Sequence, residues 1–350
     1  MIEYPKYKVT VSCKTFNQAK YITDTMNGFT MQQTSFPFVC TIVDDASTDG
    51  EQKVIRKYVE DNFDFSEGSV SYNKETDYAH ITYAQHKTNK NCYFAVLYLK
   101  VNHYTQGKDK APYLRDWVDD VEYMAICEGD DYWIDKDKLQ KQVDVMDNNP
   151  QFAMCYSSVT YYYQNLKSFS HKTFGGKSES FIDLIKDNTI PTPTVLIRLS
   201  CLDEYNKEIN PQNKMWLMGD YPIWLFFAKK YQVKYLRWEI FAVYRVLGES
   251  ASHSLDRSKK LRFVENYYEI KTFFVTNFDE GNKKLLKLIN KQKNWAFFIN
   301  NILFEEYHSA FNKKLSLNNY CGKNLIVIFV MKYIPLLRMY FRKRWLSSGL

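Results

Sequence analysis

The chain has 350 residues, of which 45% are hydrophobic and 25% are charged, the balance of a globular protein with one large domain or two small ones. Its net charge of +7 is unevenly spread, because the segment from Tyr307 onward contains eight Lys or Arg and no Asp or Glu. The rest of the chain is therefore close to neutral, which argues against general nucleic-acid binding.

Strand-like and helix-like segments alternate over the first half of the chain. This pattern is typical of an α/β fold with a mostly parallel central sheet flanked by helices. Strands are predicted over 8–13, 38–43, 80–84 and 123–127, and helices over 19–32, 51–63 and 92–102. Residues 104–121 are polar and irregular, and we expect them to form an insertion before the fourth strand.

The second half of the chain becomes progressively more helical. Its predicted elements are a helix over 137–149, strands over 152–163 and 194–198, a helix over 220–231 and further Lys-rich helices between 257 and 320. The α/β part is therefore expected to be followed by a C-terminal helical extension.

The end of the chain, residues 325–345, is apolar but is interrupted by Lys332, Pro335 and Arg338. Its longest uninterrupted apolar run has seven residues, whereas roughly 20 are needed to span a bilayer. A basic, aromatic, amphipathic segment of this kind favours the surface of an anionic membrane. The alternative is a terminal helix that packs on the rest of the protein.

Seven cysteines occur without a C-x-x-C pair, and several lie in apolar, strand-like runs. The odd number and the absence of a framework spacing predict reduced, buried thiols in a cytoplasmic protein. The first ten residues, MIEYPKYKVT, lack the pattern of a secretory signal. Together with the basic tail, this predicts a location on the inner face of the cell membrane.

Two acidic clusters follow predicted buried strands. In the stretch CEGDDYW, Glu128, Asp130 and Asp131 come directly after the apolar run YMAI, and Asp44-Asp45 follow CTIV. Carboxylates this close repel one another, so the clusters predict a divalent metal or a charged ligand at the ends of these strands. Taken alone, the Asp44 cluster is equally explained as a capped helix start.

A third carboxylate, Asp220 in MGDYPIWL, opens a predicted apolar helix. Asp is favoured at helix N-termini in any case. Since a helix N-terminus also favours negative charge, Asp220 is a candidate general base.

Five segments in order resemble the GT-A-fold glycosyltransferases of family 2, and the resemblance covers roughly residues 6–250. They are VTVSCKTFNQAKYI, VDDASTDG, CEGDDYW with the helix after it, MGDYPIWL and YRVLGESASHS. The form of CEGDDYW is similar to that of bacterial transferases for capsule, lipopolysaccharide and O-antigen. The resemblance implies a GT-A domain over 1–250, a helical region over 251–322 and a basic tail over 323–350.

The resemblance also implies roles for individual residues. Residues expected to bind the nucleotide-sugar donor are Phe16, Asn17, Asp44, Asp45, Asp130 and Arg245. Asp45 would contact the uracil, and Asp130 would face the sugar or ribose. Asp131 would hold Mg²⁺ or Mn²⁺ with His253 as a second metal contact, and Asp220 would deprotonate the acceptor hydroxyl.

The implied reaction is a single, inverting transfer of one sugar from a nucleotide-sugar, such as a UDP-sugar, to a glycan or lipid-linked acceptor. Three positions depart from the family's pattern, and the first is Lys14, which stands where small residues are usual. Leu247 replaces a common His after YRV, which weakens the assignment of His253. The Q-x-x-R-W signature of processive synthases is absent, because Lys234 stands where Gln is required, so transfer of a single sugar is favoured.

Two other functions compete with this interpretation. A sugar nucleotidyltransferase would share the α/β layering, but the sequence lacks a Gly-rich, basic phosphate loop near the first strand. A glycan-binding or scaffold protein on a transferase fold would have no need for Asp45, Asp131 and Asp220 together.

Overall fold

The computed structural model describes residues 5–248, 256–312 and 319–347. The chain divides into two compact units, and each is described by itself. The first unit comprises residues 1–180, 189–209 and 230–246, and the second comprises residues 181–188, 210–229 and 247–350.

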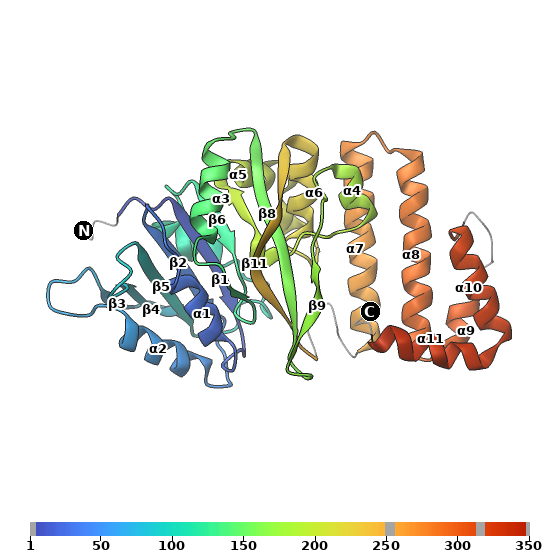
Figure 1. The fold of residues 1–350 in the computed structure, drawn as a ribbon, viewed down its shortest axis with the longest axis horizontal. Coiled ribbons are helices and arrows are strands. Elements are labelled where there is room, and N and C mark those ends of the chain that lie inside the picture. Colours follow the sequence, from blue (N-terminus) through green and yellow to red (C-terminus); the bar gives the residue numbers. More distant parts are fainter. Residues whose placement is uncertain (1–4, 249–255, 313–318, 348–350) are drawn as a thin grey trace. The chain divides into compact units, whose positions relative to one another are not determined.

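The first unit is built on one eleven-stranded sheet (Figure 1). Its strands are β1 (Val9–Thr15), β2 (Phe38–Asp44), β3 (Tyr72–Glu75), β4 (Ala79–Gln85), β5 (Cys92–Leu99), β6 (Tyr123–Ile126), β7 (Tyr132–Trp133), β8 (Phe152–Tyr163), β9 (Ser168–Phe174), β10 (Leu196–Arg198) and β11 (Gln232–Val246). Their order is β3-β4-β5-β2-β1-β6-β10-β8-β11-β7, and β9 pairs with β8.

The four central strands, β5, β2, β1 and β6, are mutually parallel, whereas most of the outer pairs are antiparallel. Their register places Thr15 opposite Asp44, and Asp44 opposite Tyr98. The carboxyl ends of these strands therefore meet at one edge of the sheet, where open α/β folds bind ligands.

The predicted fold class, an α/β sheet flanked by helices with helices at the end of the chain, is confirmed.

Helices cover both faces of this sheet. They are α1 (Ile22–Thr30), α2 (Glu51–Asn62), α3 (Lys138–Asp147) and α5 (Leu199–Ile209), with short 3-10 turns at Ala111–Trp117 and Thr192–Thr194. In Figure 1, α1 and α2 lie side by side over β1 and β2. Their apolar faces, including Phe29 and Ile55, pack with Phe94 of β5 into a fully buried core. Trp117 closes a second cluster with Val39 and Leu97.

The helix predicted over 92–102 is wrong, because this segment forms β5. All eight residues of Cys92–Leu99 are buried, with β2 parallel on one side and β4 antiparallel on the other. A strand covered on both faces has a continuous apolar sequence, which cannot be distinguished from a short buried helix by periodicity.

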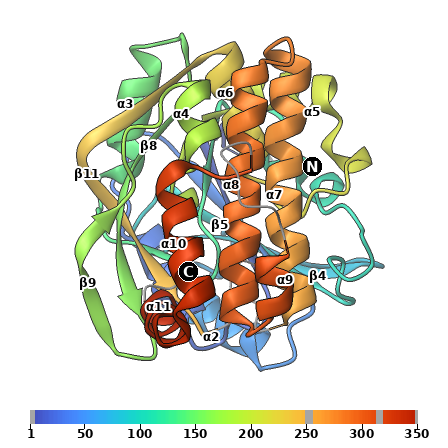
Figure 2. The same ribbon diagram turned by 90° about the vertical axis from the view of Figure 1, so that its right-hand side faces the viewer.

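The second unit is helical. Its elements are α4 (Phe181–Lys186), a 3-10 turn at Pro211–Asn213, α6 (Tyr221–Lys230), α7 (Arg257–Phe278), α8 (Lys283–Leu303), α9 (Tyr307–Phe311), α10 (Gly322–Tyr333) and α11 (Pro335–Ser347). Helices α7 and α8 lie side by side along their length (Figure 2). Asp256 and Asn282 cap their N-termini, each accepting a backbone N–H with its side chain. Ile328 and Met331 of α10 pack on Phe298 of α8.

Within the described ranges, no helix combines the length and the apolar character that are needed to cross a membrane.

Candidate functional site

The loops after β1 and β2 are tied together at the carboxyl edge of the sheet. Asn17 accepts the Thr48 N–H at 2.8 Å with its side chain, and its own N–H donates to the Ser47 hydroxyl at 2.9 Å. Asn17 has a φ of 55°, a left-handed conformation that Asn tolerates better than most residues. The side chain of Phe16 is exposed beside it. The two residues predicted from the first motif thus lie at the strand end, as a rigid turn.

Glu51, which the sequence analysis did not single out, anchors both loops. It is fully buried in the first turn of α2 and accepts hydrogen bonds from the Thr15 hydroxyl, the Gln18 N–H (2.8 Å) and the Ser47 hydroxyl (2.8 Å). Burial raises its pKa above the usual range, although these hydrogen bonds lower it in part. Its position in the first turn of a helix was the one sequence signal that could have found it.

The adjacent aspartates after β2 have different partners. Asp44 is buried and caps the turn, accepting the Ser47 N–H at 3.0 Å and the Gln52 side-chain amide at 2.7 Å through Oδ1. Its other oxygen, Oδ2, is buried and has no hydrogen-bond partner among the described residues. The environment of Asp44 is that of a turn-forming residue.

Asp45 instead fixes the segment that follows β5. Its two carboxylate oxygens accept the backbone N–H groups of His103 (2.7 Å) and Tyr104 (3.0 Å), and Lys110 forms an ion pair with it at 2.8 Å. Burial opposes ionisation, but Lys110 and these N–H groups together hold the pKa of Asp45 below its usual value. The predicted irregular insertion is therefore ordered at its base, and Lys110 is a site residue that sequence reasoning missed.

The turn after β6 is packed tightly against the end of β1. A Cβ atom on Gly129 would lie 2.2 Å from the Thr15 hydroxyl and 2.5 Å from Oε1 of Gln18. The Thr25 hydroxyl lies 2.9 Å from the Gly129 carbonyl and 2.6 Å from that of Asp131. This packing holds the CEGDDYW turn against the first motif.

Arg245 joins the end of β11 to the same turn. Its backbone N–H donates to Oδ1 of Asp131 at 2.8 Å. Its guanidinium donates to the Asp130 carbonyl (2.9 Å), to Gln164 (2.8 Å) and to Asp24 in the first turn of α1 (2.7 Å). Three tyrosine rings, those of Tyr21, Tyr132 and Tyr162, surround the guanidinium with centroids 4.8 to 5.6 Å away. Arg245 is buried, and it organises the turn.

Two carboxylates in this turn are held in conditions that disfavour their charge. Burial, followed by the neighbouring charge of Asp130, raises the pKa of Asp131 well above its usual value. Burial also raises the pKa of Asp130, which the Gln18 hydrogen bond and Arg245 only partly offset. Carboxylates in this situation are stabilised by an added cation.

The donor set fits a hard divalent cation that takes part of its coordination from a substrate. The described residues contain no group of three His, Cys, Asp or Glu side chains able to enclose a metal ion. Mg²⁺ commonly uses one or two carboxylates together with water and substrate phosphates, and Asp130 and Asp131 match that pattern. His253, the other residue predicted to contact the metal, lies outside the described residues.

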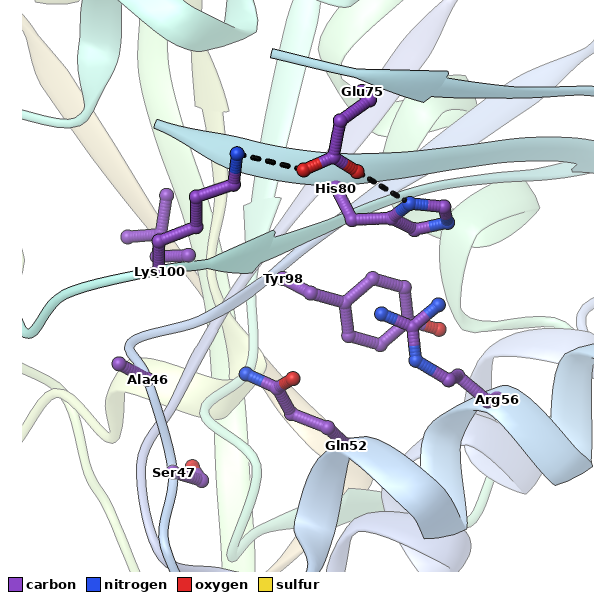
Figure 3. A pocket seen from close by; sticks show the side chains of 9 residues that line it. Ala46, Ser47, Gln52, Arg56, Glu75, His80, Tyr98 and Lys100 are labelled. Atoms are coloured by element: carbon purple, nitrogen blue, oxygen red, sulfur yellow. Dashed lines mark hydrogen bonds and ion pairs between the residues drawn. The ribbon is translucent and has the colours of Figure 1, made fainter. Parts of the chain in front are cut away.

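A polar cavity of about 420 Å³ adjoins the end of β2 (Figure 3). It lies between α2 and the β3–β4 hairpin, and Arg56 stacks on the ring of Tyr98 with a distance of 3.8 Å to the centroid. On its far wall, Glu75 forms ion pairs with Lys100 (2.6 Å) and His80 (3.0 Å). Ala46 and Ser47, in the turn that follows β2, also line the cavity. The cavity is therefore next to Asp44 and Asp45 and could accept polar groups of a ligand bound there.

Asp220 belongs to the second unit, where it directly precedes α6. Its Oδ1 accepts the Tyr221 N–H at 2.7 Å, and its carbonyl accepts the N–H groups of Ile223 and Trp224. Its side chain is half-buried. Asp220 thus occupies the N-terminal position of an apolar helix, as the sequence predicted.

No family model matches the chain. Among curated proteins, the chain is 29% identical over 187 residues to uncharacterized proteins from Mycobacterium bovis and Mycobacterium tuberculosis. The match covers 52% of this chain and 44% of those relatives, so it spans less than half of their length. These relatives carry no functional description.

Solved structures give longer matches. TarS 1–349 from S. aureus, in complex with UDP-GlcNAc, aligns over 98% of this chain and 92% of its own, with a TM-score of 0.56 and 16% identity. The mannosyltransferase PcManGT from Pyrobaculum calidifontis, in complex with GDP-Man and Mn²⁺, aligns over 99% and 86%, with a TM-score of 0.50 and 12% identity. The chain has the GT-A fold. At these identities the likeness establishes the fold alone.

Proposed function

We propose that this chain is an inverting, metal-dependent glycosyltransferase of family 2. It moves a single sugar from a nucleotide-sugar, of the UDP-linked class, to a hydroxyl group of a glycan or lipid-linked acceptor. The observation that carries this proposal is the meeting of three strand ends at one edge of a GT-A sheet, where β1, β2 and β6 lead directly into Asn17, Asp45 and Asp131. We assign the transferase domain to 1–250, the helical region to 251–322 and the basic tail to 323–350.

The donor would bind along this edge. Phe16 and Asn17 offer an exposed ring and a rigid turn, and Asp45 offers a carboxylate fixed by backbone amides. Lys110, 2.8 Å from Asp45, and Arg245, whose guanidinium contacts the turn after β6, place positive charges beside the carboxylates of this edge. These charges offset the carboxylates and so reduce the repulsion of an anionic donor such as a nucleoside diphosphate.

Asp131, with Asp130 beside it, would hold the Mg²⁺ or Mn²⁺. When bound, the cation supplies charge neutralisation for the leaving diphosphate. The protein itself would hold the turn that contains Asp130 and Asp131 in place, through the close packing of Gly129 and the hydrogen bonds of Arg245.

Asp220 would take the proton from the acceptor hydroxyl as its oxygen attacks the anomeric carbon from the face opposite the nucleotide. One bond forms to the acceptor oxygen while the bond to the diphosphate breaks, so a single displacement inverts the configuration. The position of Asp220 at the N-terminus of α6 favours its negative charge.

The acceptor class that fits this protein is a growing surface glycan, such as capsule or lipopolysaccharide, at the inner face of the cell membrane. Helix α10 supports a membrane location. Ile326, Phe329 and Tyr333 form an exposed apolar stripe at spacings of three and four residues, while Ile328 and Met331 are buried on the other side. One apolar face of α10 is thus buried in the protein, and the other is available to an apolar environment such as a membrane.

Basic side chains accompany this stripe. Lys323 and Lys332 of α10 and Lys343 of α11 are exposed, and Met339 and Tyr340 of α11 add further exposed apolar surface. Apolar side chains flanked by Lys suit the interface of an anionic bilayer. We propose that α10 and α11 bring the enzyme to its lipid-linked acceptor.

The role of Asp220 has a direct test. The Asp220→Asn variant should fold and bind nucleotide like the wild type but turn over at least ~100-fold more slowly. Nucleotide affinity and turnover are measured on the same preparations. Near-normal turnover would contradict the assignment of Asp220 as the base.

A further inference from the structure

Strand β11 contains a large irregularity halfway along its pairing with β8. Tyr235 lies opposite Tyr156, whereas Ile240 lies opposite Ser158, so residues 236–239 face a single residue of β8. Bulges of this kind push the extra residues out of the sheet and are over-represented beside binding sites.

The bulge is fixed at both ends. On one side, Glu239 accepts a charged hydrogen bond from Lys141 of α3 at 3.0 Å, and Lys141 also pairs with Asp135 at 2.8 Å. On the other side, the Tyr235 N–H donates to Glu179 at 2.9 Å. These contacts tie the two ends of the bulge to α3 and to Glu179.

The fixed bulge presents an unusually exposed indole. The side chain of Trp238 is 84% exposed, more than any other large hydrophobic side chain among the described residues. The Arg237 guanidinium lies 4.7 Å from the centroid of its ring. An exposed indole offers a flat apolar platform on which a partner can stack.

The platform borders a groove of about 570 Å³, lined by Lys177, Glu179, Lys234, Tyr235, Arg237 and Trp238. Three of these side chains are cations and one is an anion. The anion, Glu179, is already engaged by the Tyr235 N–H and by Lys177 at 3.4 Å. The groove therefore has an excess of positive charge, from Lys234 and Arg237 above all.

We propose that this groove binds an acidic oligosaccharide, that is, a glycan carrying carboxylate or phosphate groups. The apolar C–H face of a sugar ring would stack on Trp238, and the acidic group would pair with Arg237 and Lys234. The volume of the groove is within the range of small-ligand sites. In the context of the proposed function, on which this part rests, the glycan is the acceptor chain or a segment of it.

A single-stranded nucleic acid uses the same combination of aromatic and basic side chains. The charge of the chain favours the glycan, because the residues before Tyr307 are nearly neutral as a whole.

The test measures binding of fluorescently labelled oligogalacturonide to the full chain by anisotropy, without a nucleotide-sugar. A labelled malto-oligosaccharide is the neutral probe, and a labelled single-stranded oligonucleotide is the probe for the alternative. The decisive variant is Trp238→Ala, since it changes no charge and cannot act through the basic tail. Its control is Leu166→Ala, which removes another exposed apolar side chain outside the groove.

We expect the acidic probe to bind more tightly than the neutral one, and Trp238→Ala to weaken it by about 10-fold. The double variant Lys234→Gln/Arg237→Gln should weaken it as well, and the exposed-charge control Lys172→Gln should not. Donor hydrolysis is measured separately on the wild type without glycan, so failure of the proposed activity would be visible separately from failure of glycan binding.

Unchanged affinity of both groove variants for the acidic probe would overturn the proposal. So would tighter binding of the oligonucleotide that is lost in Trp238→Ala, because the groove would then be a nucleic-acid site. Should Trp238→Ala fail to fold, the charge variants decide the question alone.

Discussion

The backbone N–H of Arg245 donates a hydrogen bond of 2.8 Å to Oδ1 of Asp131, across 114 positions of the chain. The same residue holds the Asp130 carbonyl through its side chain. One buried arginine thus fixes both aspartates of the turn that carries the predicted metal residue, and its other partners, Gln164 and Asp24, fix the arginine.

The first prediction concerns this arrangement. Arg245→Lys should lower the free energy of unfolding by about 1–3 kcal/mol, because an ammonium group cannot reach Asp24, Gln164 and the Asp130 carbonyl together. Asp24 is 54% exposed in its side chain, so Asp24→Asn should cost less than about 1 kcal/mol. Urea denaturation measures both, and an Arg245→Lys protein as stable as the wild type would contradict the account.

A second prediction concerns Gly129. Gly129→Ala should destabilise the protein by about 1–3 kcal/mol, since the new methyl group would overlap Thr15. Gly176→Ala is the matched control, because the nearest atom to its new Cβ, the Thr189 hydroxyl, lies 3.9 Å away, and it should stay within about 0.5 kcal/mol of the wild type. Equal stability of the two variants would show that the turn does not require glycine.

A third prediction concerns pH. Burial lowers the pKa of Lys138 from 10.5 to about 7, and its ammonium lies 2.7 Å from the Gln142 side-chain oxygen and 4.1 Å from the centroid of the Trp133 ring. Between these two pKa values the unfolded chain keeps the proton and the folded chain releases it. Because the unfolded state binds more protons at Lys138 in this window, the destabilising contribution of Lys138 should shrink as the pH rises from about 7 to 10.

Lys138→Met removes this titration. The variant should gain stability relative to the wild type at pH 7, and the gain should shrink by up to about 1.4 kcal/mol per pH unit towards pH 10. Urea denaturation of both proteins at pH 7, 8, 9 and 10 gives the difference directly. Parallel pH profiles would mean that Lys138 keeps its charge in the folded protein.

A fourth prediction concerns the membrane surface. Replacing Ile326, Phe329 and Tyr333 together by Ser should reduce binding to anionic liposomes at least ~10-fold, because these side chains form the exposed stripe of α10. The unfolding transition should be unchanged, since the buried side of α10, with Ile328 and Met331, is retained. Sedimentation with liposomes, with neutral liposomes as the control, measures this. Undiminished binding would contradict the prediction that the exposed stripe of α10 binds the membrane.

The fold class followed from the sequence because alternation of buried strands with amphipathic helices is a local pattern. β8 was predicted with its observed bounds, Phe152–Tyr163. β5 was missed because its two faces are buried by distant segments, Phe29 and Ile55 on one side and Trp117 on the other, which no window of sequence contains. The strand β11 was not predicted either, since its pairing with β8 is interrupted by the bulge.

The residues of the candidate site that belong to short sequence motifs were predictable. Asp44, Asp45, Asp130 and Asp131 stand at the ends of predicted strands, and the parallel register brings those ends to one edge. The supporting residues were not predictable in the same way. Lys110 pairs with Asp45 from a segment without a recognisable pattern, and Glu51 resembles an ordinary first-turn residue until its burial is known.

Metal-dependent sugar transfer is tested by incubating the protein with UDP-, GDP-, dTDP- and CMP-sugars, with and without Mn²⁺, and measuring nucleotide release. We expect metal-dependent release from one donor, strongest for a UDP-sugar, and its loss in Asp131→Asn. Neither release nor metal-dependent nucleotide binding, from any donor in the panel, would contradict it and favour a glycan-binding protein on a transferase fold.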